Sequence, residues 1–246
     1  MRKSIIAVDN FYSDPSSVIA YAIRQKYYFP YDDDHDVVDK KKDFHWKASW
    51  FKSANQCPFK SSELLIKKLE EITGDEIDRV HWNSDFPIAK DGKGIPEDGM
   101  GNPADFPNSY SCLWNCSFHL KNDVGQQLGD GVHSHVTDRW NSVGINGWAG
   151  VIYLNPYAPI HGGLNLWRNA NPAKNFDWMT PKENWIQLDS LGNIFNRLIL
   201  VRGNMPHSGA NGWGPDLKTG RLYQTFFFKI IEKENTDNGV KVVTVS

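Results

Sequence analysis

The sequence lacks the features that stabilise small secreted proteins or place a chain in a membrane. It has three cysteines, Cys57, Cys112 and Cys116, an odd count without CxxC spacing. This gives no sign of a zinc knuckle or a disulfide framework and favours reduced, buried thiols. No run approaches the roughly 20 apolar residues that cross a bilayer, and the apolar run 5–8 is too short for a signal peptide. We therefore expect a cytoplasmic protein with no membrane partner.

An excess of charge of one sign is also lacking. Lys and Arg total 27 and Asp and Glu 29, so the net charge is -2 and no basic footprint for nucleic acid is present. Aromatic residues are plentiful, because 10 Trp and 13 Phe exceed what a core of this size requires, and some rings could line a cavity. Length leaves the domain count open, but we find no linker or repeat and expect a single domain over residues 1–246.

Helical patterns are confined to the first third of the chain. Ser13 is a possible N-cap and Pro15 suits the first turn of a helix whose apolar residues continue to Ile23. A second helix is expected from about Ser62 to Thr73, because its apolar residues form a stripe and Gly74 follows as a stop signal. We expect residues 1–80 to form a helical support region.

After residue 80 the pattern changes to short β-type runs separated by turn residues. The clearest are SYSCLWNCSFHL, WAGVIYLNP, NRLILVRG and RLYQTFFFKII. WAGVIYL and RLILV are almost continuously apolar, as strands covered on both faces are. The pattern predicts a mainly β fold with flanking helices and a jelly-roll core over residues 81–232. Two polar segments, 89–108 and 167–185, interrupt the strands and suit functional lids or mobile insertions.

Three histidines have positions suited to binding a metal. His133 and His135 are two residues apart in DGVHSHVTD, so on an extended strand both imidazoles project from one face. His207 follows NRLILVRG within GNMPHSGANGWG, where glycines let the backbone approach a ligand. A strand-borne pair and one distant histidine can form a facial metal site. The plain alternative is that histidines flanking a serine in a polar turn are surface residues.

Arg221 is the other residue with a candidate role. It lies 14 residues beyond His207 and opens the aromatic run RLYQTFFFKII. A guanidinium is always charged and binds carboxylates bidentately, so Arg221 could anchor a dicarboxylate co-substrate inside the fold. Otherwise it is a strand-end arginine whose charged group reaches water.

These features, taken in order, resemble the iron(II)- and 2-oxoglutarate-dependent oxygenases. They are HSH, then WAGVIYLNP with PIHGG, a distal histidine, and an arginine on a final aromatic strand. The chain is most similar to the small prolyl-hydroxylase-like members, over roughly residues 105 to 230. The resemblance implies a double-stranded β-helix (cupin-like) fold, with His133 as first metal ligand and His207 as distal ligand. It also implies that Arg221 binds the C5 carboxylate of 2-oxoglutarate, with Tyr153 a weaker candidate for the same group.

The chain departs from that family at one ligand position. Where the family has a carboxylate two residues after the first histidine, this sequence has His135. Three explanations are open: His135 binds the metal itself, Asp138 supplies the carboxylate, or the position stays open, as in the halogenating branch, where a halide takes it. Strand spacing favours His135.

The resemblance implies an enzyme that uses Fe(II), 2-oxoglutarate and dioxygen to hydroxylate a small molecule or an amino-acid side chain. Two other classes remain open. Three histidines can also hold the zinc of a hydrolase, for which Asp130 and Asp138 are the only obvious general-base candidates. A jelly roll could instead be a non-catalytic carbohydrate-binding module with exposed tryptophans as stacking platforms, but Arg221 would then have no role.

Overall fold

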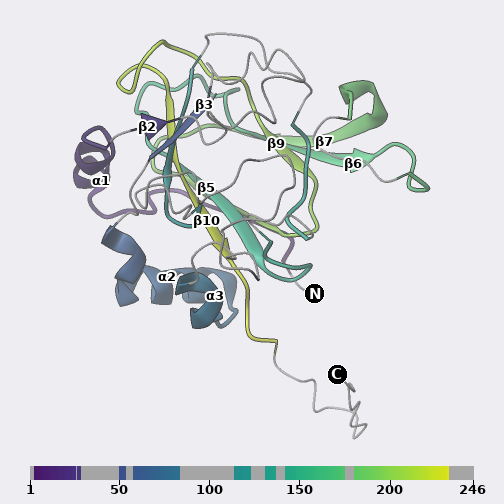
Figure 1. Cartoon of the computed structure of the whole chain (residues 1–246), viewed down its shortest axis with the longest axis horizontal. Coiled ribbons are helices and arrows are strands. Elements are labelled where there is room, and N and C mark those ends of the chain that lie inside the picture. Colours follow the sequence, from purple (N-terminus) through teal and green to yellow (C-terminus); the bar gives the residue numbers. More distant parts are fainter. Residues whose placement is uncertain are drawn as a thin grey trace, which may run out of the picture.

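The computed structural model describes residues 3–25, 27–28, 50–53, 58–83, 114–122, 131–136, 142–174 and 180–232. The larger of its two antiparallel sheets has the strand order β1-β8-β5-β10-β4-β3-β2. These strands are β1 Ile5–Val8, β8 Leu198–Arg202, β5 Trp148–Tyr153, β10 Arg221–Phe228, β4 Phe118–Lys121, β3 Trp50–Ser53 and β2 Tyr27–Tyr28. Of these strands, Figure 1 labels β2, β3, β5 and β10. The smaller sheet has the order β7-β6-β9, formed by Trp185–Leu191, Leu164–Asn169 and His207–Gly209. The described part of the chain is therefore mainly β, as predicted.

Three helices complete the described elements: α1 Pro15–Ala22, α2 Glu63–Thr73 and α3 Arg79–Asn83, with short 3-10 turns at Pro58–Ser61 and Lys182–Asn184. α2 agrees with its prediction, because the Ser62 hydroxyl accepts from the Leu65 N–H and Gly74 ends the helix in the left-handed region at φ 74°. The predicted cap of α1 was wrong by one residue. Asp14, and not Ser13, accepts the Ser17 N–H, at 3.1 Å.

The helices and the smaller sheet cover opposite faces of the larger sheet. Ile152 and Leu200 belong to the core cluster that includes residues of α1 and α2. Val151 and Ile199 point the other way and pack with Leu166 of the smaller sheet. β5 and β8 are therefore buried on both faces, which confirms the interpretation of their continuous apolar runs. The space between the two sheets is where the candidate site lies.

The first 80 residues also contribute to the larger sheet. β1 pairs with β8, and β3 pairs with β4, so this region supplies three strands as well as helices. The prediction of a helical support region omitted them, because runs of two to four residues, one of them half exposed, carry little periodic signal. Of the predicted strand 109–120, residues 109–113 lie outside the described part of the chain, residues 114–117 form a turn, and β4 begins at Phe118.

The structure describes much of one predicted polar segment and none of the other. Segment 89–108 lies outside the described residues. Segment 167–185 contains the end of β6 and the start of β7, which pair with a register shift between Leu166 and Trp167. The exposed residues of β7 conceal its strand pattern in the sequence. Within the described residues, no helix is both long and apolar enough to span a bilayer.

Candidate functional site

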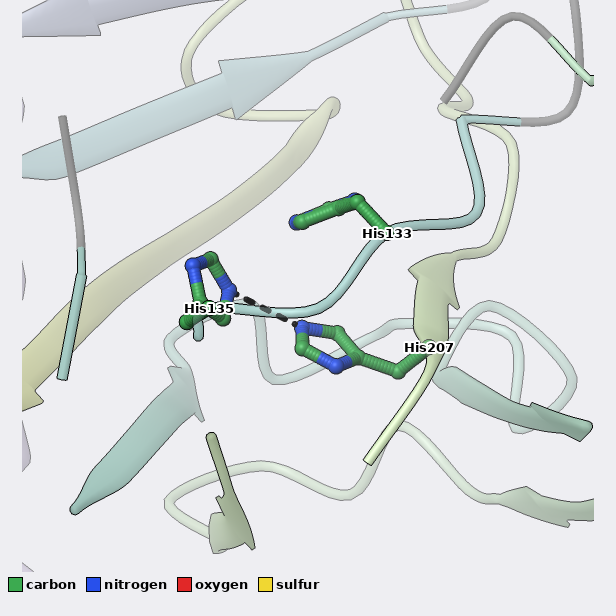
Figure 2. A group of neighbouring side chains, drawn as sticks. All are labelled: His133, His135 and His207. Atoms are coloured by element: carbon green, nitrogen blue, oxygen red, sulfur yellow. Dashed lines mark hydrogen bonds between the residues drawn. The ribbon is translucent and has the colours of Figure 1, made fainter. Parts of the chain in front are cut away.

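Backbone pairing brings the three predicted histidines together. The segment 131–136 runs beside β9, where His133 and His207 each donate their N–H to the other's carbonyl, at 3.0 and 2.9 Å. His135 is held by its own N–H donating to Gly203 O at 2.7 Å and by its carbonyl accepting from Val143 N–H at 2.9 Å. Because directly paired residues and residues two apart share a face, all three imidazoles point into the same space (Figure 2).

The spacing of the rings suits a single cation. One ligand nitrogen from each of His133, His135 and His207 can be chosen so that all lie within 4.8 Å of one another. The Nε2 atoms of His135 and His207 are 3.2 Å apart (Figure 2). Two imidazole nitrogens at about 2.1 Å from one metal are separated by about 3.0 Å at a right angle and about 3.4 Å in a tetrahedron. The observed separation falls between these values.

Hydrogen bonds orient two of the rings. His133 Nδ1 lies 2.7 Å from Gly131 O, and His207 Nδ1 lies 2.8 Å from Met205 O. A carbonyl only accepts, so each Nδ1 carries the proton and each Nε2 keeps its lone pair for a ligand. A histidine that donates its other ring N–H to a carbonyl is the usual arrangement around protein metals.

The histidine cluster is largely enclosed by the protein. His135 and His207 are buried and His133 is half-buried. Burial, reinforced by the other two imidazoles, lowers the pKa of His207 well below its usual value. The Phe227 ring packs 4.9 Å from that of His135. Three imidazole nitrogen donors beside an apolar ring fit a first-row divalent cation. Asp138 and Asp130 lie outside the described residues.

Arg221 is buried without an acidic contact among the described residues. Only 2% of its surface is exposed. Its Nε donates to Gly162 O at 2.8 Å and its Nη2 to Gly163 O at 3.1 Å. The guanidinium carbon lies 4.6 Å from the centre of the Tyr223 ring and 5.7 Å from that of Tyr153. Removing a guanidinium from water is costly unless an anion compensates it, so this environment is suited to receive one.

Tyr153 adds an unused hydrogen-bond donor beside Arg221. Its ring is fully buried, and its phenolic oxygen has no hydrogen-bond partner among the described residues. Burial raises the pKa of Tyr153 to about 12, against the opposing effect of the nearby guanidinium. The phenol is therefore protonated at neutral pH and can donate. A buried cation next to an unsatisfied donor forms a candidate anion pocket.

Gly209 connects this pocket to the histidines. A Cβ at Gly209 would lie 3.0 Å from Nη1 of Arg221, so the guanidinium rests against the side-chain face of β9. His207 is two residues away and uses the same face, about 6.8 Å along the strand. The imidazoles and the guanidinium therefore line one interior between the two sheets.

Other basic residues share this interior and were absent from the sequence-based site. Register pairs Lys121 of β4 with Arg221, His119 with Tyr223, and Lys52 of β3 with His119. All three added side chains are buried. The alternation in FHLK places His119 and Lys121 on one face, but that signal acquires meaning only once β4 is known to pair with β10.

His119 stacks in the middle of this row. Its ring centre lies 5.1 Å from that of Tyr223, at an interplanar angle of 12°. Its Nε2 lies 2.9 Å from the Ser117 hydroxyl and 3.0 Å from the Thr225 hydroxyl. Burial, together with Lys52 and Arg221, lowers the pKa of His119 well below its usual value. The imidazole is thus a neutral spacer between cationic side chains.

Most of the aromatic side chains that the structure describes lie in the core and not at the site. Trp148 packs on the helix side of the larger sheet, and Trp167 packs with Val132 and Trp185. Phe227 alone of residues 226–228 faces the histidines. Among the tryptophans whose side chains the structure describes, none is exposed.

Comparisons with known proteins give little support for any assignment. No protein-family model matches the chain, and no curated protein matches it. One solved structure that it resembles is a prolyl hydroxylase from Trichoplax adhaerens in complex with a peptide fragment of the hypoxia inducible factor oxygen degradation domain. That likeness covers 92% of this chain and 83% of the other, with 12% identity and a TM-score of 0.41. At this level it does not decide the activity.

Proposed function

We propose that this chain is an iron(II)- and 2-oxoglutarate-dependent oxygenase that hydroxylates a small molecule or an amino-acid side chain. His133, His135 and His207 would hold the metal, and Arg221 with Tyr153 would hold the C5 carboxylate of 2-oxoglutarate. The proposal includes a single domain over residues 1–246 with a double-stranded β-helix core, located in the cytoplasm. The observation that carries it is the position of the three imidazoles and the buried guanidinium on one interior face.

The separation of the two subsites supports a five-carbon diacid. In 2-oxoglutarate, two methylenes separate the 2-oxo acid from the distal carboxylate, so the two ends are about 5 Å apart. His207 and Gly209 lie about 6.8 Å apart along β9, and Nη1 of Arg221 lies against Gly209. A ligand of this length can reach the metal with one end and the guanidinium with the other.

The described residues have separable tasks. His133 and His207 present Nε2 lone pairs because Gly131 and Met205 hold the Nδ1 protons. Arg221 balances the charge of the distal carboxylate, and the Tyr153 hydroxyl donates to it. When bound, iron and the 2-oxo acid supply dioxygen-dependent oxidation, in which 2-oxoglutarate is converted to succinate and carbon dioxide.

His135 in place of a carboxylate changes the charge of the site. Three neutral imidazoles leave a divalent cation with one more unit of positive charge than two histidines and a carboxylate do. The contact between His135 and His207 supports the three-histidine explanation. The proposal therefore places Asp138 outside the ligand set.

A zinc hydrolase is the second candidate, because the 3.2 Å nitrogen separation also suits a tetrahedral site. It gives the buried Arg221 and the Tyr153 hydroxyl no task. Activity with iron and with zinc, measured after anaerobic purification, separates the two enzymes. A carbohydrate-binding module is less favoured, since the described tryptophans offer no exposed platform.

The test is turnover of 2-oxoglutarate by the iron-loaded chain. We expect succinate to form in air, to increase with the correct member of a panel of small molecules and peptides, and to be absent in His207→Ala. Succinate made without a substrate is weaker support, since uncoupled turnover can produce it. A chain that binds no iron(II) and makes no succinate across the panel is not an oxygenase of this class.

A further inference from the structure

A lysine converges with Arg221 on the same corner of the smaller sheet. Lys121 and Arg221 are directly paired in the register of β4 and β10, so their side chains leave the sheet on one face. Lys121 Nζ donates to Ala210 O at 3.1 Å. Arg221 Nη1 lies beside the adjacent Gly209. Two cationic groups therefore approach neighbouring peptide units at the end of β9.

We propose that Lys121 is a second basic residue of the pocket formed by Arg221 and Tyr153. Its amine binds the same ligand carboxylate that Arg221 binds, and it takes up one proton from the solvent when that carboxylate binds. The inference rests on the proposed function for the identity of the natural diacid. The pocket itself is argued from the positions of Lys121, Arg221 and Tyr153.

The electrostatics around Lys121 support this coupling. Burial, with a further contribution from Arg221, lowers the pKa of Lys121 to about 7. A carboxylate placed between the two groups favours the charged form of the amine and raises that pKa again. The amine is therefore partly neutral before the ligand binds and protonated afterwards.

The other titratable side chains around Lys121 differ from it in pKa or in position, so their effects on binding can be told apart from that of Lys121. A guanidinium does not titrate in the range of the experiment. Burial lowers the pKa of His119 well below its usual value and raises that of Tyr153 to about 12. Tyr223 and Lys52 complete the described groups on this inner face. In the segment 210–220, which Lys121 contacts, Asp216 and Lys218 are exposed. Replacing Lys121 alone isolates its contribution.

The experiment measures glutarate binding to the full-length, metal-loaded chain under nitrogen by calorimetry. Glutarate carries a distal carboxylate but no 2-oxo acid, so the pocket is tested apart from metal chelation. For the wild type, Kd should rise about tenfold from pH 7 to 9, because affinity is lost as pH rises above the pKa of the free amine. Titration at pH 8 in buffers of different ionisation enthalpy should show uptake of about one proton.

Three variants complete the design. Lys121→Met should bind about tenfold more weakly at pH 7 and lose the pH dependence, because it lacks the charge. Lys121→Arg should bind tightly at both pH values, since its charge does not titrate. Lys218→Met, an exposed lysine nearby, should match the wild type.

The inference is overturned if glutarate does not bind, if wild-type binding is independent of pH, or if Lys121→Met matches the wild type. If the chain forms succinate but the Kd for glutarate does not change with pH, only this inference is lost and the proposed function stands. Lys121-dependent binding of glutarate in a chain that never makes succinate would keep the pocket and remove the oxygenase.

Discussion

His133 and His207 lie directly opposite each other, joined by reciprocal backbone hydrogen bonds of 3.0 and 2.9 Å. Each side chain also has its Nδ1 within 2.8 Å of the carbonyl two residues before it. The backbone pairing sets where the two rings stand, and the carbonyls set which nitrogen faces inward. The pair is therefore preorganised for a ligand before any cation arrives, and His135 joins it from two residues along the chain.

The three-histidine arrangement predicts opposite results for two alanine variants. His135→Ala should weaken iron(II) binding by about 100-fold or more, because loss of a ligand costs more than the 10- to 100-fold of an outer contact. Asp138→Ala should bind iron as the wild type does. Metal titration under nitrogen checks both. Weak iron binding in Asp138→Ala with normal binding in His135→Ala would show that the carboxylate is the ligand.

Gly209→Ala should weaken ligand binding at the diacid pocket without changing metal binding. The added Cβ would stand 3.0 Å from Nη1 and 3.3 Å from Nη2 of Arg221, while Gly162 and Gly163 carbonyls limit the retreat of the guanidinium. We expect 2-oxoglutarate to bind about tenfold more weakly, through a loss of about 1.4 kcal/mol, and iron to bind unchanged. Equal loss of both ligands would mean that the substitution distorts β9.

Tyr153→Phe should weaken 2-oxoglutarate binding severalfold without destabilising the fold. The hydroxyl is buried and has no hydrogen-bond partner in the part of the chain that the structure describes. Because an unsatisfied buried hydroxyl costs about 1 to 3 kcal/mol, its removal should leave the free energy of unfolding equal or higher. Denaturant unfolding and calorimetry measure the two quantities. A clear loss of stability would instead give the hydroxyl a structural role.

The buried His119 predicts a pH dependence of stability. Its pKa in the folded state is well below 6.5, whereas an unfolded chain restores the ordinary value. The unfolded state then binds the extra proton, so the free energy of unfolding should fall as pH drops below about 6.5, by up to about 1.4 kcal/mol per pH unit for this residue. His119→Phe keeps a ring in the stack and should reduce the slope by about one proton. An unchanged slope between pH 6.5 and 5 would contradict the assignment.

Some of the fold could be predicted from local patterns. The apolar runs of β5 and β8 report burial on both faces, and α2 carries its own cap and stop signals. β1 is too short to show periodicity, and Ser13 and Asp14 are adjacent residues that both suit an N-cap. These features depend on tertiary pairing or on one backbone angle, which local sequence does not specify.

The candidate site was likewise predictable from the sequence only in part. The spacing of His133 and His135 and the start of the aromatic strand at Arg221 are visible in the sequence. Lys121 and His119 became candidates only from the register of β4 against β10. Nothing in the sequence marks Gly209 as the residue against which the guanidinium rests.

The most direct test of the account is calorimetric binding of 2-oxoglutarate under nitrogen, with and without iron(II), to the wild type and to Arg221→Met. We predict one molecule bound per chain, much more tightly when iron is present, because the metal and the guanidinium hold opposite ends of the same diacid. Arg221→Met should keep its iron and lose most of this affinity, whereas Arg168→Met, an exposed arginine, should not. Binding that is indifferent to both iron and Arg221 would contradict the account.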